Sequence, residues 1–163
     1  MLVLSFLAAV LLHECGHLFA LSLFHARIES ARLSPFGITL THTHLSSPIA
    51  SLTVAAFGPL FGIIGYVVLQ YSGHLPVFCA VSLFLSIFNL LPIRTLDGGR
   101  IASAALSLWL SPERAENTAR TLSGCALLFL WLIGGHILFI ENGSPSLFLM
   151  ALALFFEHLK TED

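Results

Sequence analysis

Residues 2–24 read LVLSFLAAVLLHECGHLFALSLF, an apolar run that contains the pentapeptide HECGH at residues 13–17. The run has the length and character of a membrane-spanning helix, which needs about 20 mainly apolar residues. Positions i and i+4 share one face of a helix, so His13 and His17 can present two imidazoles to one metal ion. In this H-E-x-x-H arrangement Glu14 acts as general base on a water at the metal. Packing alone does not explain the motif, because burying an unpaired carboxylate costs several kcal/mol.

The composition of the chain indicates an integral membrane protein. Of its 163 residues, 56% are hydrophobic and only 10% are charged, whereas about a quarter of the residues in a soluble domain are charged. The net charge of −2 and the lack of a basic patch give no reason to expect nucleic acid as a partner. All three cysteines lie in apolar runs, which argues against a disulfide framework. We expect a single membrane domain over residues 1–163, surrounded by the lipid bilayer.

Four further apolar segments are candidates for membrane helices: residues 49–71, 75–91, 121–140 and 147–158. The last of them is short and can be a partial span. The pair Gly58-Pro59 predicts a kink in the second helix, because proline removes a backbone donor and clashes with the preceding turn. The predicted fold class is therefore an all-α polytopic membrane protein with about five transmembrane helices.

The basic residues predict an orientation in the membrane. With five spans and the N-terminus outside the cell, all seven Lys and Arg residues fall on the side of the C-terminus. The positive-inside rule makes that side the cytoplasm. We therefore expect a multi-pass protein of the cell membrane, most naturally a bacterial inner membrane, with a cytoplasmic C-terminus.

A polar segment between the first two helices predicts a small β-hairpin at the membrane surface. Residues 38–44 alternate with period two and are rich in β-branched side chains, as in a strand. Residues 28–33 can pair with this strand across the turn-forming sequence SPFG. An open strand edge near Ile38 and Leu40 can accept an extended peptide by strand addition. The alternative is a covered hairpin that binds no ligand.

A catalytic zinc site needs a third protein ligand besides two histidines. Among the nine acidic residues, Asp97 has the most unusual setting, within NLLPIRTLDGGR at residues 89–100. Pro92 ends the third helix, and the glycines after Asp97 allow backbone geometry closed to other residues. From such a turn Asp97 can reach a metal between helices, or it can cap a helix at residues 100–110. The residues alone leave both roles open.

Three motifs together resemble those of the site-2 protease family of intramembrane zinc metalloproteases. They are HECGH in the first helix, Gly58-Pro59 in the second, and the long sequence NLLPIRTLDGG. The resemblance covers nearly the whole chain. The chain is similar in particular to the sporulation-type branch, which it also matches at LSPFG (residues 33–37) and FFE (residues 155–157).

The resemblance implies a zinc metalloendopeptidase that cleaves a membrane-embedded or membrane-associated protein, such as a pro-sigma or anti-sigma factor. It implies that His13, His17 and Asp97 bind one Zn²⁺ per chain, and that Glu14 is the catalytic base. Zinc lowers the pKa of a bound water toward about 7, so that Glu14 can take its proton. Regulatory membrane proteins are further expected partners.

Several features depart from the family pattern. Gly62 stands where the family often has an asparagine, so a polar contact there is absent or supplied by another residue. The sporulation branch usually has an extra helix before the HExxH helix and a cystathionine-β-synthase-type (CBS) domain after the last one. Neither is seen here, nor is a PDZ insertion, so we expect the catalytic core alone.

Two other functions are compatible with the motif. A metal transporter or metal-binding membrane protein would need ligands along a path across the bilayer, whereas the strong ligands here cluster at one depth. A catalytically silent homologue would bind substrates without cutting them, although the intact Glu14 argues against this. Asn89 is a candidate substrate contact, but an asparagine within a span can equally join helices.

Overall fold

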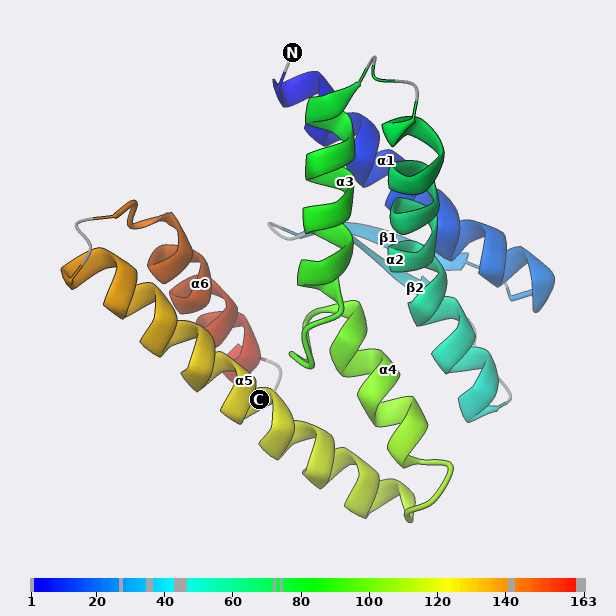
Figure 1. The fold of residues 1–163 in the computed structure, drawn as a ribbon. Helices are drawn as coiled ribbons and strands as arrows, with labels where there is room; N and C mark the ends of the chain where they lie inside the picture. The colour runs from blue at the N-terminus through cyan, green and yellow to red at the C-terminus, as the bar shows by residue number, and fades with distance from the viewer. Residues whose placement is uncertain are drawn as a thin grey trace. The chain divides into compact units, whose positions relative to one another are not determined.

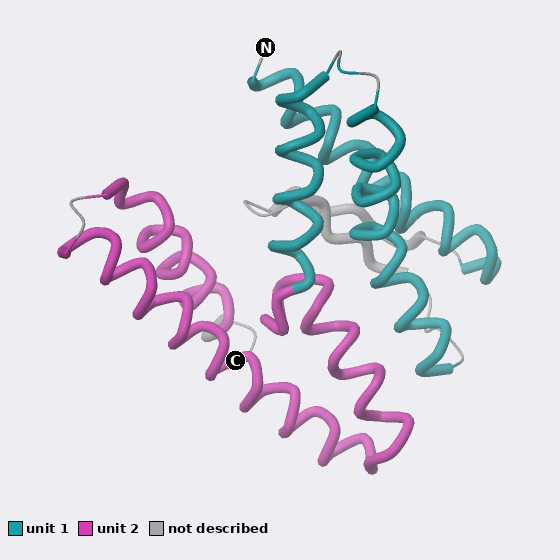
Figure 2. Tube along the Cα trace, in the orientation of Figure 1, with its two compact units in different colours: residues 1–90 teal, residues 91–163 magenta. Residues whose placement is uncertain are grey.

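The computed structural model describes residues 2–26, 28–34, 37–42, 47–71, 73, 75–140 and 143–160. Six helices and a two-stranded sheet follow one another along these residues (Figure 1). In chain order they are α1 (Leu2–Leu23), β1 (Ile28–Ser34), β2 (Gly37–His42), α2 (Pro48–Gln70), α3 (Pro76–Asn89), α4 (Asp97–Leu106), α5 (Pro112–Phe139) and α6 (Ser146–Lys160). The chain divides into two compact units, residues 1–90 and residues 91–163 (Figure 2).

In the first unit, helices α1, α2 and α3 all pack against one another. One part of their core contains Ala9, Phe78 and Cys79, and another contains Ala20, Leu21 and Val54. Most of these side chains are small, which allows the helix backbones to approach closely.

Local sequence signals set the ends of the helices in the first unit. Helix α1 ends in a Schellman motif: His25 has a φ of 50°, and the Ala26 N–H donates to the Leu21 carbonyl at 3.1 Å. Helix α2 begins after Ser47, whose hydroxyl accepts the Ala50 N–H at 3.2 Å. It then runs without interruption through Pro59, the site of the predicted kink.

Strands β1 and β2 form an antiparallel hairpin within the first unit. Leu33 pairs with Ile38 and Ala31 with Leu40, and the register is irregular between Ile28 and Ser30. Among the described residues β2 pairs with β1 alone. The side chains of residues 27–46 lie outside the part of the chain that the structure describes. The structure therefore gives the backbone of Ile38 and Leu40 but not their contacts.

In the second unit, α5 packs against both α4 and α6. Gly134 brings α5 close to α6, because a Cβ there would lie 3.0 Å from the backbone of Phe148. Helix α5 begins at Pro112, nine residues before the apolar run predicted as a span. The helix extends beyond the predicted span because its first turns are amphipathic: Ala115 and Ala119 are buried, while Glu113 and Arg114 are exposed.

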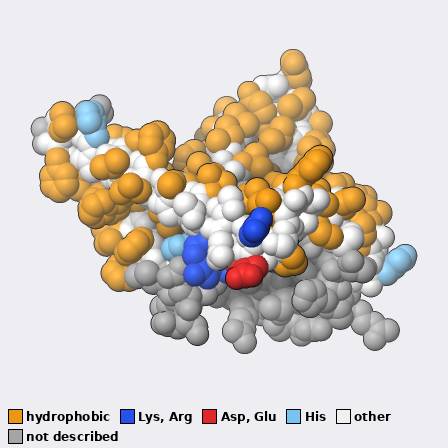
Figure 3. Space-filling view, turned by 90° about the horizontal axis from the view of Figure 1, so that it is seen from below, with side chains coloured by type: hydrophobic (Ala, Val, Ile, Leu, Met, Phe, Trp, Pro, Cys, Tyr) orange, Lys and Arg blue, Asp and Glu red, His pale blue; other side chains and the backbone are white. Residues whose placement is uncertain are grey.

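The surface of the helices is that of a membrane protein. Helices α1, α2 and α5 are long and apolar enough to cross a bilayer, whereas α3 and α6 are shorter apolar helices. Large hydrophobic side chains point outward on the long helices, including Leu4, Val68 and Phe129. Hydrophobic side chains make up most of the coloured surface in Figure 3, and the charged side chains in view gather in one small area. Such a surface fits lipid rather than water. The fold is a helical membrane fold, and the count of five spans stays a prediction.

Candidate metal centre

The two histidines of the HECGH motif lie on one buried face of α1. His13 is 5% exposed and His17 is 8% exposed, one helical turn apart. Their Nε2 atoms face each other at 3.2 Å. Two ligand nitrogens on one tetrahedral zinc, each about 2.0–2.1 Å from the metal, are separated by about 3.3 Å. The spacing of the pair therefore fits two ligands of a single zinc ion.

Helix α2 fixes the orientation of the second imidazole. The Nδ1 atom of His17 lies 2.8 Å from the carbonyl oxygen of Val54, which can only accept. Nδ1 therefore carries the proton, and Nε2 presents its lone pair toward His13. A hydrogen bond from the other ring nitrogen to a backbone carbonyl is the usual support of a metal-binding histidine.

Two glycines allow α1 and α2 to approach at this point. A Cβ on Gly16 would lie 2.8 Å from the carbonyl carbon of Phe57. A Cβ on Gly58 would lie 2.9 Å from Nε2 of His13 and would collide with the ring of His17. From the sequence, Gly58 was expected to be part of a kink and of a family motif, not a point of close contact between helices. The signal for its second role was the presence of small residues on two apolar helices, which is typical of close helix contacts.

Glu14 is positioned by α1 directly beside the first histidine. Its side chain is partly buried, and the carboxylate oxygen Oε2 is shielded from solvent. A general base of this motif needs such a place, because it must reach the water at the metal without binding the metal itself.

Asp97 belongs to the second unit, where it is the first residue of α4 and is only 7% exposed. The residue in the N-cap position is Leu96, and it makes no side-chain capping bond. The alternative in which Asp97 caps a helix at residues 100–110 is therefore wrong, because α4 already begins at Asp97. Like His13 and His17, Asp97 is a buried side chain of a metal-binding type.

The remaining predicted site residues have less distinctive surroundings. Asn89 is the last residue of α3, is 8% exposed, and donates its amide to the Leu85 carbonyl at 2.9 Å. This bond stays within its own helix. At Gly62, where the family often has asparagine, two serine hydroxyls of α3 supply polar groups: Ser82 donates to the Gly62 carbonyl at 3.0 Å, and Ser86 lies against its Cα.

Comparison with known proteins gives consistent results. The family model of peptidase family M50 matches residues 71–133, which include Asp97. Stage IV sporulation protein FB from Bacillus subtilis is 31% identical over 142 residues, covering 80% of this chain and 49% of that protein. A zinc metalloprotease from Methanocaldococcus jannaschii is 31% identical over 136 residues, covering 74% and 40%. The chain spans half or less of the length of these curated relatives.

A solved structure supports the same assignment. The site-2 protease from Methanocaldococcus jannaschii matches with a TM-score of 0.74 and 25% identity, over 96% of this chain and 75% of that one. Together with the HExxH pair, this fold defines a membrane protein of the metalloprotease class. The chain belongs to peptidase family M50, the site-2 protease family.

Proposed function

We propose that this chain is an intramembrane zinc metalloendopeptidase that cleaves membrane-embedded or membrane-associated proteins. The observation that carries the proposal is the buried pair His13 and His17, with Nε2 atoms 3.2 Å apart and one ring oriented by Val54. In the middle of an apolar helix, two imidazoles held in this way are costly unless they bind something. A tetrahedral cation is the ligand that fits their spacing.

His13, His17 and Asp97 would hold one zinc ion per chain. Two histidines and one carboxylate form a common ligand set of catalytic zinc, which keeps its fourth position for water or substrate. All three side chains are buried, as a protected site requires. In this proposal the carboxylate of Asp97 is the third ligand beside the two imidazoles.

Glu14 carries the proton in this mechanism. When bound, the zinc would lower the pKa of a water to about 7 and polarise the peptide carbonyl. Glu14 accepts the proton as water attacks that carbonyl, and then donates it to the leaving amine. Its place next to His13 on α1 lets it do both, while His13 and His17 keep their orientation.

The substrate would bind as an extended segment, because helical hydrogen bonds shield a carbonyl from attack. Strand β2, with Ile38 and Leu40, offers an edge for strand addition, and the amide of Asn89 is a further candidate contact. By analogy with the sporulation protein, the substrate would be a sigma factor precursor or an anti-sigma factor. The protein would lie in a bacterial inner membrane with its C-terminus in the cytoplasm. Other membrane proteins would regulate it.

Replacement of Glu14 tests the proposal. For Glu14→Gln we expect one zinc per chain, as in wild type, and cleavage of a tagged membrane substrate reduced by at least about 100-fold, because general-base catalysis contributes about 10²–10⁴-fold. Glu113→Gln, at an exposed position in α5, is the matched control and should cleave normally. Equal cleavage by Glu14→Gln and wild type would refute the assigned role, and a transporter would not depend on this proton acceptor.

A further inference from the structure

The turn that precedes Asp97 is anchored to α5 at two points. The backbone N–H of Arg94 donates to the hydroxyl of Ser123 at 3.0 Å. The guanidinium of Arg94 forms an ion pair with the carboxylate of Glu116. Ser123 is completely buried, so its hydroxyl is a fixed acceptor rather than one that exchanges with water.

Helix α4, which begins with Asp97, is anchored to the same carboxylate. The hydroxyl of Ser103 donates to Oε2 of Glu116 at 3.3 Å. Glu116 therefore joins Arg94, three residues before Asp97, to Ser103, six residues after it. The position of Asp97 is set from both sides by one residue of α5.

The turn also packs tightly on the start of α4. The N–H of Leu96 donates to the carbonyl of Ile93 at 2.8 Å. A Cβ on Gly99 would lie 2.5 Å from the carbonyl carbon of Ile93 and 2.6 Å from the Cα of Arg94. These are backbone atoms and cannot move aside independently. A shift of Arg94 would therefore be transmitted to the helix that carries Asp97.

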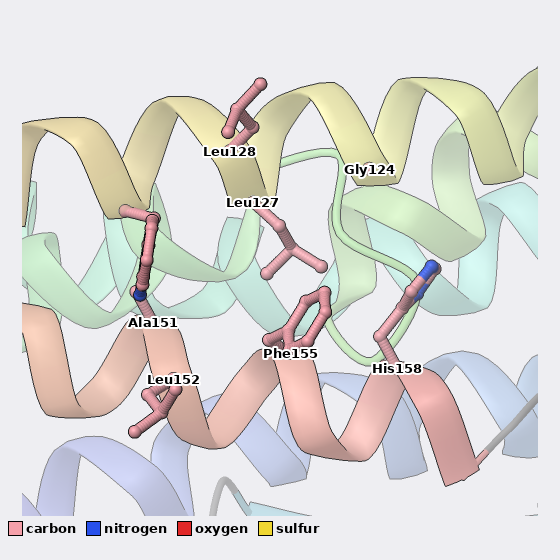
Figure 4. A pocket seen from close by; sticks show the side chains of 8 residues that line it. Gly124, Leu127, Leu128, Ala151, Leu152, Phe155 and His158 are labelled. Atoms are coloured by element: carbon pink, nitrogen blue, oxygen red, sulfur yellow. The ribbon is translucent and has the colours of Figure 1, made fainter.

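The anchoring residues form one face of α5, since Glu116, Ala119 and Ser123 follow helical spacing. Ala119, between the other two on this face, is buried. Behind Ser123, Nδ1 of His158 lies 3.5 Å from the hydroxyl. Figure 4 shows His158 projecting from α6 toward α5 beside a pocket of about 480 Å³. Apart from the imidazole, the side chains that line this pocket are apolar.

We propose that Ser123 and Glu116 are positioning residues, which fix the turn at Arg94 and thereby the carboxylate of Asp97. Neither residue touches substrate or metal in this assignment. The inference rests on the proposed function, in which the carboxylate of Asp97 is the third zinc ligand and must therefore be held in place. Outer-shell partners of this kind change metal affinity by about 10–100-fold when they are removed.

The test measures Co²⁺ binding by the detergent-purified full chain, through the visible absorption spectrum and by competition with a chelator. Ser123→Ala should bind Co²⁺ about 10–100-fold more weakly than wild type, with an altered spectrum. Ser123→Thr retains the hydroxyl and should restore both. Thr121→Ala is the matched control, because Thr121 is exposed and its hydroxyl donates within α5, to the Asn117 carbonyl at 3.0 Å.

Glu116→Gln keeps the proposal testable if Ser123→Ala does not fold, because Glu116 is 40% exposed and its replacement leaves the core intact. It should also weaken Co²⁺ binding and alter the spectrum. Variants of Ser123 and Glu116 that both match Thr121→Ala in affinity and spectrum would overturn the positioning role and leave the proposed function standing. A wild-type protein that is folded but binds no Co²⁺ or Zn²⁺ would overturn both.

Discussion

At the residue scale, the predicted metal centre depends on the absence of a side chain at Gly58 of α2. Both imidazoles occupy the space where a Cβ of Gly58 would lie. The carbonyl of Val54, one turn earlier on α2, holds the ring of His17 at 2.8 Å. The same helix thus orients one of the two predicted ligands and leaves room for both. Any side chain at position 58 must displace the rings or the helix.

Gly58→Ala should weaken zinc binding by about 10–100-fold, the loss expected when the support of a ligand is disturbed. Chelator competition on the purified protein measures this. The control is Gly65→Ala, the same substitution in the same helix, where the added Cβ meets only the flexible end of Leu12. If both variants bound zinc as tightly as wild type, the close packing of Gly58 on the histidines would be refuted.

At the scale of the elements, α2 and α3 are held together by a close contact of small residues. The hydroxyl of Ser86 lies where a Cβ of Gly62 would be, and Ser82 donates to the Gly62 carbonyl. Ser86 itself donates to the carbonyl of Ser82 at 2.8 Å, within its own helix. Because this hydrogen bond stays within α3, the Ser86 hydroxyl does not bond α3 to α2. Its main effect at this contact is to fill the space beside Gly62.

Gly62→Ala should lower the free energy of unfolding by about 1–3 kcal/mol, because it overpacks this contact. Adding Ser86→Ala removes the atom that the new Cβ meets, and the double variant should recover most of the loss. Thermal unfolding in detergent measures both, with Ser86→Ala alone as the reference. Strictly additive effects of the two substitutions would show that the residues do not share a contact.

Local geometry made much of the site and of the elements predictable. The pairing of His13 with His17 follows from the helical repeat, and the start of α2 follows from Ser47 and Pro48. The bond from His17 to Val54 could not be predicted, because it depends on how α2 packs against α1. Helix α4 begins earlier than the capping alternative for Asp97 required, because Asp97 is its first residue and Leu96 is the N-cap.

At the scale of the whole molecule, the apolar surface of the helices and the family assignment agree on a membrane protein. The sequence pattern predicted this because a bilayer requires long apolar helices. It did not predict the division at residues 90 and 91, which depends on contacts between distant segments. Asp97 lies beyond that division and the two histidines before it. The third ligand was therefore predicted through resemblance rather than through local spacing.

The orientation in the membrane is a separate prediction at this scale. All seven Lys and Arg residues lie on one side if five helices span and the C-terminus is cytoplasmic. A fluorescent protein fused after residue 163 should then fold and fluoresce, and alkaline phosphatase at the same position should be inactive. Fusions of both reporters within residues 72–74 are the matched control and should give the reverse result. Active phosphatase at the C-terminus would contradict the predicted topology.

The central claim is that His13, His17 and Asp97 hold one zinc ion. Zinc K-edge X-ray absorption on the detergent-purified protein, combined with its metal content, tests this most directly. We predict one zinc per chain, bound by two imidazole nitrogens and by oxygen ligands at about 2.0–2.2 Å, with no sulfur ligand. The zinc content of Asp97→Asn should be lower than that of wild type. Folded protein without zinc, or a sulfur ligand from the neighbouring Cys15, would contradict the account.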